Sequence, residues 1–61
     1  MENLTGKQHV TLAAAVEMGY FQVPRQADQS DLADELGVTE QAVSERLRRA
    51  CETVVAEAVE A

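Results

Sequence analysis

The segment Leu36-Gly37-Val38-Thr39 constrains the fold of this 61-residue chain most, because it joins two predicted helices through a very short turn. Gly37 tolerates the left-handed backbone with which many helices end. Thr39 is suited to N-cap the following helix by accepting a hydrogen bond from a free backbone N–H. Val38 is apolar inside the turn, and we expect it to fill the angle between the helices.

Apolar residues on both sides of this turn recur at helical spacing. Leu32, Ala33 and Leu36 form one stripe before the turn, and Val43 and Leu47 lie four residues apart after it. These features are typical of a DNA-binding helix-turn-helix (HTH), whose second helix enters the major groove. They also occur in helical hairpins without a DNA role, so a helical interaction module is the alternative.

The second predicted helix is polar on its outward face, and polar side chains there can reach base edges or phosphates. We predict a recognition helix over residues 40–49. Its outward positions are Gln41, Ser44, Glu45 and Arg48, while Arg46 and Arg49 flank them at positions suited to phosphates.

The net charge of −6 argues against DNA at first sight, since DNA-binding domains usually carry a basic patch. Residues 40–49 nevertheless hold three arginines and two glutamates, a net charge of +1 that leaves −7 for the remainder. An acidic remainder with few lysines is also typical of adaptation to very high salt, where the Debye length is about 3 Å at 1 M. The alternative is an acidic protein without a DNA role.

The short length predicts one domain, 1–61, with a small core. The single Cys51 excludes an internal disulfide, and one His and one Cys at distant positions predict no metal site and no cofactor. His9 has no nucleophile nearby and the carboxylates show no paired spacing, so we predict that the chain is not an enzyme. Without a signal peptide or an apolar run of membrane-spanning length, it is expected to be cytoplasmic.

The N-terminal part predicts a helix from Gly6 to Met18, with Thr5 and Gln8 at the spacing of a capping box. The expected core face is Gln8, Leu12, Ala15, Val16 and Gly19. A second apolar line, on nearly the opposite side, consists of Val10, Ala14 and Met18.

The following loop contains both aromatic residues of the chain, Tyr20 and Phe21, which we expect to anchor packing. Pro24 excludes helix there, and Arg25 is either a phosphate contact or a surface residue without a role. Asp28 is suited to N-cap the next helix.

The last helix has no Gly, Pro or Asn to end it after the turn. Its extension, residues 50–61, has little of the small domain left to pack on, yet it is apolar on one side. We expect it to form a homodimer, either helix to helix or against the Val10, Ala14 and Met18 line of the other copy. An exposed tail is the alternative. The apolar residues of the extension are Val54, Val55, Ala58 and Val59.

The combination of Gly19-Tyr20-Phe21, Val23-Pro24-Arg25 and the run from Gln41 to Ala50 resembles a known family. It is similar to the HTH domain of the archaeal bacterioopsin-activator type, which itself resembles region 4 of bacterial sigma factors. The family occurs mainly in salt-loving archaea, and the domain commonly ends larger regulators that carry sensory domains. No sensor is present here, so the chain is expected to be a stand-alone regulator or an excised fragment.

The resemblance implies a recognition helix with named roles. Gln41 is expected to read adenine, and Arg48 to read guanine or hold a phosphate. Glu45 is expected either to accept from a cytosine amino group or to pair with Arg48 or Arg49. The groove-facing positions that the resemblance implies are Thr39, Glu40, Gln41, Ser44, Glu45 and Arg48.

Together these observations predict an all-α, three-helix HTH domain with a core over 28–49 and a recognition helix extended into a long C-terminal helix. The predicted function is a sequence-specific transcription regulator that binds double-stranded DNA as a homodimer. The alternative is an interaction module that modulates a larger regulator without binding DNA itself.

Overall fold

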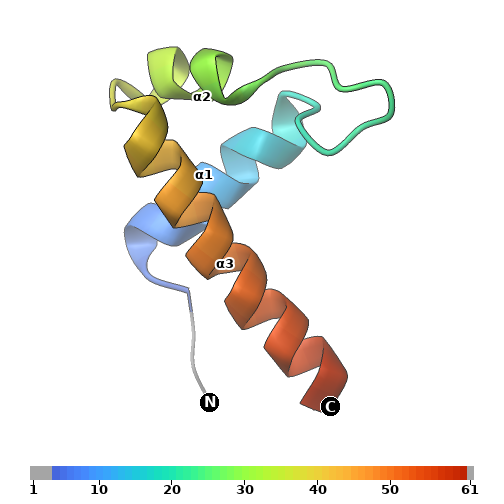
Figure 1. The fold of residues 1–61 in the computed structure, drawn as a ribbon. Coiled ribbons are helices and arrows are strands. Elements are labelled where there is room, and N and C mark those ends of the chain that lie inside the picture. Colours follow the sequence, from blue (N-terminus) through green and yellow to red (C-terminus); the bar gives the residue numbers. More distant parts are fainter. Residues whose placement is uncertain (1–3, 61) are drawn as a thin grey trace.

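The computed structural model describes residues 4–60, which contain three helices and no strand (Figure 1). The helices are α1 (Gly6–Glu17), α2 (Gln29–Leu36) and α3 (Glu40–Glu60). In Figure 1, α3 crosses α1 and then continues past both other helices, so its last turns project from the body of the domain. The predicted all-α class and the long C-terminal helix are confirmed.

Each helix begins at the N-cap that the sequence predicts. Thr5 and Gln8 form a reciprocal capping box, with the Gln8 N–H 3.2 Å from Thr5 Oγ1. Asp28 and Asp31 form a second box, in which both N–H···O distances are 3.0 Å. The Ala42 N–H donates to Thr39 Oγ1 at 3.1 Å. The caps satisfy backbone donors that have no partner inside the helix, so they define where each helix starts.

Two glycines in the left-handed conformation end α1 and α2. Gly19 has a φ of +81°, and the next N–H, that of Tyr20, donates to the Ala15 carbonyl at 2.9 Å. Gly37 has a φ of +69°, and the Val38 N–H donates to the Ala33 carbonyl at 3.0 Å. Both arrangements are Schellman motifs. The first helix ends one residue before the predicted Met18, which is the C-cap.

The core lies where the three helices meet. Leu32 and Ala33 of α2 pack with Val43 and Leu47 of α3, and Ala15 of α1 completes the cluster. Val38 packs against this cluster from the turn between α2 and α3, as predicted. The predicted stripes of the helical pair are therefore the inner surfaces of α2 and α3.

The predicted core face of α1 is correct for Leu12, Ala15 and Gly19 and wrong for Val16. Thr11 and Ala15 are fully buried, whereas Val16, expected inside, is 61% exposed. Ala14 and Met18, expected on nearly the opposite side, pack against the core. The Thr11 hydroxyl donates to the Lys7 carbonyl at 2.8 Å, and this bond satisfies the polar group in its buried position.

The loop between α1 and α2 holds the two aromatic residues in different environments. Tyr20 is half-buried and packs against the core, as expected. Phe21 meets the Tyr20 ring edge-on, with ring centroids 5.1 Å apart, but is itself exposed, so it is not the core anchor predicted. The Arg25 guanidinium lies 4.3 Å from the Tyr20 ring centroid, and its Nε donates to the Tyr20 carbonyl at 3.1 Å. The Val23–Pro24 peptide bond is cis.

Candidate nucleic-acid interface

The first half of α3 divides into an inner and an outer side. Val43, Leu47 and Ala50 are buried against the other helices. Gln41 and Arg48 are exposed, and the helical period places them on the outer side. The core therefore determines which α3 side chains face outward.

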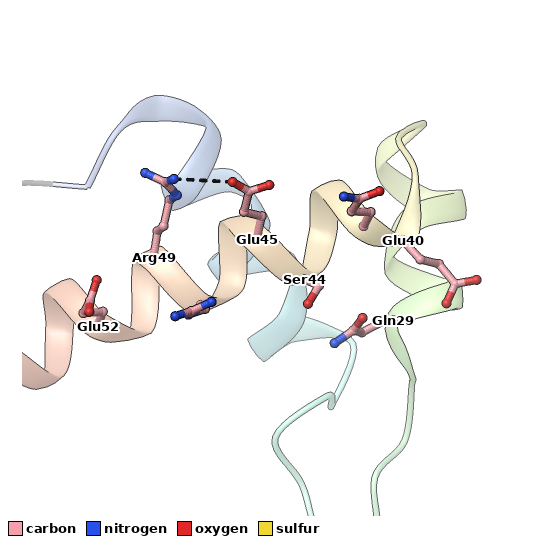
Figure 2. A pocket seen from close by; sticks show the side chains of 8 residues that line it. Gln29, Glu40, Ser44, Glu45, Arg49 and Glu52 are labelled. Carbon is pink, nitrogen blue, oxygen red and sulfur yellow. Dashed lines mark hydrogen bonds and ion pairs between the residues drawn. The ribbon is translucent and has the colours of Figure 1, made fainter.

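A shallow groove runs along this outer side, and Figure 2 shows the side chains that line it. Most come from α3, and one comes from the first residue of α2. Six of the eight predicted site residues lie here, which brings together side chains that the sequence placed only by period. The lining residues are Gln29, Glu40, Gln41, Ser44, Glu45, Arg48, Arg49 and Glu52.

The two other predicted site residues do not line this groove. The Thr39 hydroxyl is engaged as the N-cap of α3, although the residue is exposed. Arg46 is half-buried, since its position on α3 lies close to the inner side. The structure places both at the margin of the outer surface.

The groove carries charges of both signs. Glu45 Oε1 and Arg49 Nη2 form an ion pair at 3.4 Å, one helical turn apart, with both side chains at least 60% exposed. The sequence predicts that Glu45 either contacts a cytosine or pairs with a neighbouring arginine, and this ion pair is the second of those arrangements. Three glutamates and two arginines line the groove, a net charge of −1. A polyanion would therefore gain little long-range attraction from this surface.

Sequence reasoning missed two lining residues, Gln29 and Glu52. Glu52 lies four residues after Arg48, so helical period alone could have found it once α3 was continued. Gln29 comes from another helix, and its Nε2 donates to the Tyr20 hydroxyl oxygen at 3.2 Å. Nothing in the local pattern signals that approach, because it depends on how α2 crosses α3.

The distal half of α3 presents a second, apolar surface. Val54, Val55 and Val59 are exposed, and the last of them is 78% accessible to solvent. The neighbouring Ala58 is exposed as well. Large apolar side chains clustered on a projecting helix are typical of a contact with another molecule.

Three further features of residues 4–60 concern metals, the thiol and membranes. This part of the chain contains no group of three or more His, Cys, Asp or Glu side chains able to hold a metal ion. Cys51 is a free, half-buried thiol. None of the three helices is long and apolar enough to cross a membrane.

A capped helical pair, a tight left-handed turn and a polar outer side on the second helix are typical of helix-turn-helix DNA-binding domains. A family model described as an HTH DNA-binding domain matches residues 4–56. The chain belongs to this family, which is of the bacterioopsin-activator type, and the resemblance predicted from the sequence is confirmed.

Two relatives from halophilic archaea carry the name dimethyl sulfoxide reductase transcriptional activator. The protein of Halobacterium salinarum is 57% identical over 44 residues, which cover 72% of this chain and 20% of that protein. The protein of Haloferax volcanii is 39% identical over 59 residues, which cover 97% of this chain and 27% of that protein. The chain thus spans only a fifth to about a quarter of these relatives. No solved structure matches it.

Proposed function

We propose that the chain is a sequence-specific, DNA-binding transcription regulator whose residues 40–49 enter the major groove. The observation that carries this proposal is the exposed outer side of α3, where Gln41, Ser44 and Arg48 stand opposite the buried row that fixes the helix. An α-helix fits the major groove, and these side-chain types are those that read base edges. The relatives named as transcriptional activators support a regulatory role.

Within this proposal each lining residue has a role set by its chemistry. Gln41 offers an amide that can pair with both N6 and N7 of adenine, and Arg48 can grip guanine or a phosphate. Glu45 either accepts from a cytosine amino group or stays paired with Arg49. Thr39 and Arg46 meet the DNA backbone at the margin, and Arg49 does so wherever Glu45 releases it. Glu40 faces the DNA at the N-terminal end of α3.

We also propose that two copies pair through the distal half of α3, residues 50–61, while 28–49 form the DNA-binding core. A 61-residue chain buries little apolar surface alone, and burying the exposed valines between copies would add to it. A dimer also presents two recognition helices to two half-sites. Val10 is the only member of the predicted second apolar line that remains exposed, since Ala14 and Met18 pack on the core.

The test is enrichment of genomic DNA fragments by the purified protein across a KCl series that reaches molar concentrations. We expect sequence-selective binding that persists at high salt, and the enriched motif to contain two related half-sites. A folded protein that selects no fragment at any salt concentration contradicts the proposal.

A second candidate, a protein-interaction module that does not bind DNA, is favoured by one observation. Glu40, Glu45 and Glu52 line the groove and repel phosphate. Charge reversal of Arg46, Arg48 and Arg49 separates the two functions. Loss of DNA binding with intact self-association supports the regulator, whereas a wild type that associates but never retains DNA supports the module.

A further inference from the structure

The loop between α1 and α2 differs in charge from the rest of the chain. Residues 18–27 contain no carboxylate, and Arg25 is their only charged side chain, although the whole chain has a net charge of −6. Arg25 is exposed, and within residues 4–60 it forms no ion pair. Its positive charge is therefore available to an anionic partner, whereas Arg49 in the groove is paired with Glu45.

Arg25 is held against Tyr20 in a way that leaves part of its guanidinium free. Its Nε donates to the Tyr20 carbonyl at 3.1 Å, and the group stacks on the Tyr20 ring, 4.3 Å from the centroid. The bond uses only the Nε donor, so both Nη groups stay available along one edge of the flat guanidinium. Stacking also restricts the rotamers of the side chain in advance, so less conformational entropy is lost on binding.

Tyr20 also connects this loop to the groove on α3. Its hydroxyl oxygen accepts from Gln29 Nε2 at 3.2 Å, and Gln29 lines the groove. In Figure 2 the chain that leads from α1 into α2 lies beyond Gln29, on the side of the groove away from the Glu45–Arg49 pair. One tyrosine thus contacts the groove edge through its hydroxyl and Arg25 through its ring and carbonyl. Arg25 therefore lies outside the groove, past the edge that Gln29 forms.

A DNA duplex with α3 in its major groove would place a minor groove next to this loop. The major groove is bordered on each side by a phosphate strand, and the minor groove lies beyond that strand. The side chains around Arg25 favour the minor groove over a phosphate contact. Phe21 is 51% and Val23 98% exposed, and exposed apolar side chains contact bases and sugars in minor grooves but gain nothing from a charged phosphate.

We propose that Arg25 enters the minor groove next to the major groove that α3 occupies, and that it selects A·T-rich sequence there by the width of the groove. The inference rests on the proposed DNA-binding function and adds a second point of sequence selection outside the recognition helix. A·T-rich tracts have a narrow minor groove with an enhanced negative potential, which attracts arginine. The contact also supplies positive charge that the groove on α3, with a net charge of −1, lacks.

The test measures binding by fluorescence anisotropy to a selected DNA site whose flanking base pairs are varied. The site itself is kept constant, and the pairs on either side are A·T, G·C or I·C, where I is inosine. An I·C pair presents the minor groove of A·T, because inosine lacks the guanine N2 amino group, and the major groove of G·C. We expect the wild type to bind the A·T and I·C duplexes about three- to tenfold more tightly than the G·C duplex, the range of one net hydrogen bond. Equal binding to all three duplexes would overturn the inference.

Arg25→Ala should remove this preference. We expect its affinity to fall about three- to tenfold on the A·T and I·C duplexes and less than about twofold on the G·C duplex. Equal losses on all three duplexes would assign Arg25 to a phosphate and overturn the minor-groove contact. Lys7→Ala is the matched control, because it removes the same charge from the exposed surface of α1 and should leave the preference intact.

Arg25→Lys keeps the charge but replaces the flat guanidinium with a compact, strongly hydrated ammonium. It should lose the preference for A·T and I·C flanks, because the ammonium neither stacks on Tyr20 in the same way nor fits the narrow groove as a plane. A lysine variant with the full preference would overturn the role given to the guanidinium. Arg25 is exposed, so both variants should remain folded, and far-UV circular dichroism checks this.

An Arg48→Ala variant on the same duplexes distinguishes failure of this inference from failure of the proposed function. If the wild type selects its site and Arg48→Ala weakens binding on all flanks, an absent flank preference overturns this inference alone. If the wild type selects no DNA, both are overturned. Unchanged DNA binding by Arg25→Ala would also overturn the inference, and would favour another protein as the partner of the exposed loop.

Discussion

The two halves of α3 differ in how much of their surface the rest of the domain covers. Over residues 40–50 the inner side is buried against α1 and α2, and the outer side is polar. Over residues 51–60 no side chain is fully buried, and the valines are exposed. One uninterrupted helix thus carries two surfaces of opposite chemistry. The polar surface is fixed by the domain's own core, whereas the apolar surface lacks a partner within residues 4–60.

The contrast teaches that a long helix need not serve one purpose. In the first half, the core decides the orientation of the outward side chains. In the second half, apolar side chains are exposed to water, which is unfavourable. Contact with another surface would bury them and gain free energy. Four variants, each with a control, test whether the two halves are independent.

The largest expected effect comes from Leu47→Ala in the first half. Leu47 is 5% exposed, and truncating a buried leucine costs about 2–5 kcal/mol. A domain of this size has a free energy of unfolding of roughly 3–9 kcal/mol, so the variant should be largely unfolded in mild urea. Far-UV circular dichroism at low protein concentration measures this. Val59→Ala, the distal counterpart, should change the unfolding of the monomer by less than about 0.5 kcal/mol. Similar losses of unfolding free energy in Leu47→Ala and Val59→Ala would show that the two halves do not differ in this way.

The combined change Val54→Ser, Val55→Ser and Val59→Ser should convert the proposed dimer to a monomer. Each valine buried between copies stabilises the dimer by about 1.5–3 kcal/mol. Sedimentation velocity measures the change, and binding to a single half-site should survive it. Val16→Ser is the matched control, because Val16 is 61% exposed but lies on α1. An unchanged sedimentation coefficient would place self-association elsewhere.

Arg48→Ala tests the polar half and should leave self-association unchanged. A lost base or phosphate contact costs about 1–3 kcal/mol, or roughly 5- to 150-fold in DNA affinity. Anisotropy on a panel of single-base variants then assigns the contact. A relaxed preference at one base pair indicates base reading, and equal loss on all sequences indicates a phosphate. Lys7→Ala makes the same charge change on the exposed surface of α1 and should have less than a twofold effect.

Glu45→Gln should have the smallest effect on stability and a measurable one on salt dependence. Exposed pairs one helical turn apart contribute about 0.3–0.5 kcal/mol. Release of Arg49 lets it neutralise one more phosphate, so the slope of log K against log salt should steepen by about 0.9. Glu60→Gln changes the same charge at the distal end and should leave the slope as it is. A slope unchanged in Glu45→Gln would show that Arg49 does not reach DNA.

The parts of the fold that depend on neighbours in sequence could be predicted. The caps at Thr5, Asp28 and Thr39 are each completed within three residues, and the left-handed Gly37 follows from the same local chemistry. The outward row of α3 was also predictable, because Val43 and Leu47 fix the inner side and the helical period then places the rest.

The parts that depend on tertiary packing could not be predicted. On α1, Val16 was expected inside because it is more apolar than Thr11, yet Thr11 is fully buried and Val16 is 61% exposed. Gln29 lines the groove because of how α2 crosses α3, and no period or motif predicts its bond to Tyr20, nine residues earlier. Both features depend on how whole helices cross, which local sequence patterns do not determine.

Because α3 is unbroken, the angle around the helix axis between its polar and apolar surfaces is fixed. Each residue turns the helix by about 100°, so Val55 and Val59 lie on nearly the same angular side as Gln41 and Arg48, whereas Val54 continues the inner side. A partner helix seated on Val55 and Val59 would therefore stand on the same side of α3 as the DNA, further along its axis. One inserted residue between the halves would swing that partner by about 100°, whereas seven would restore the phase to within about 20°.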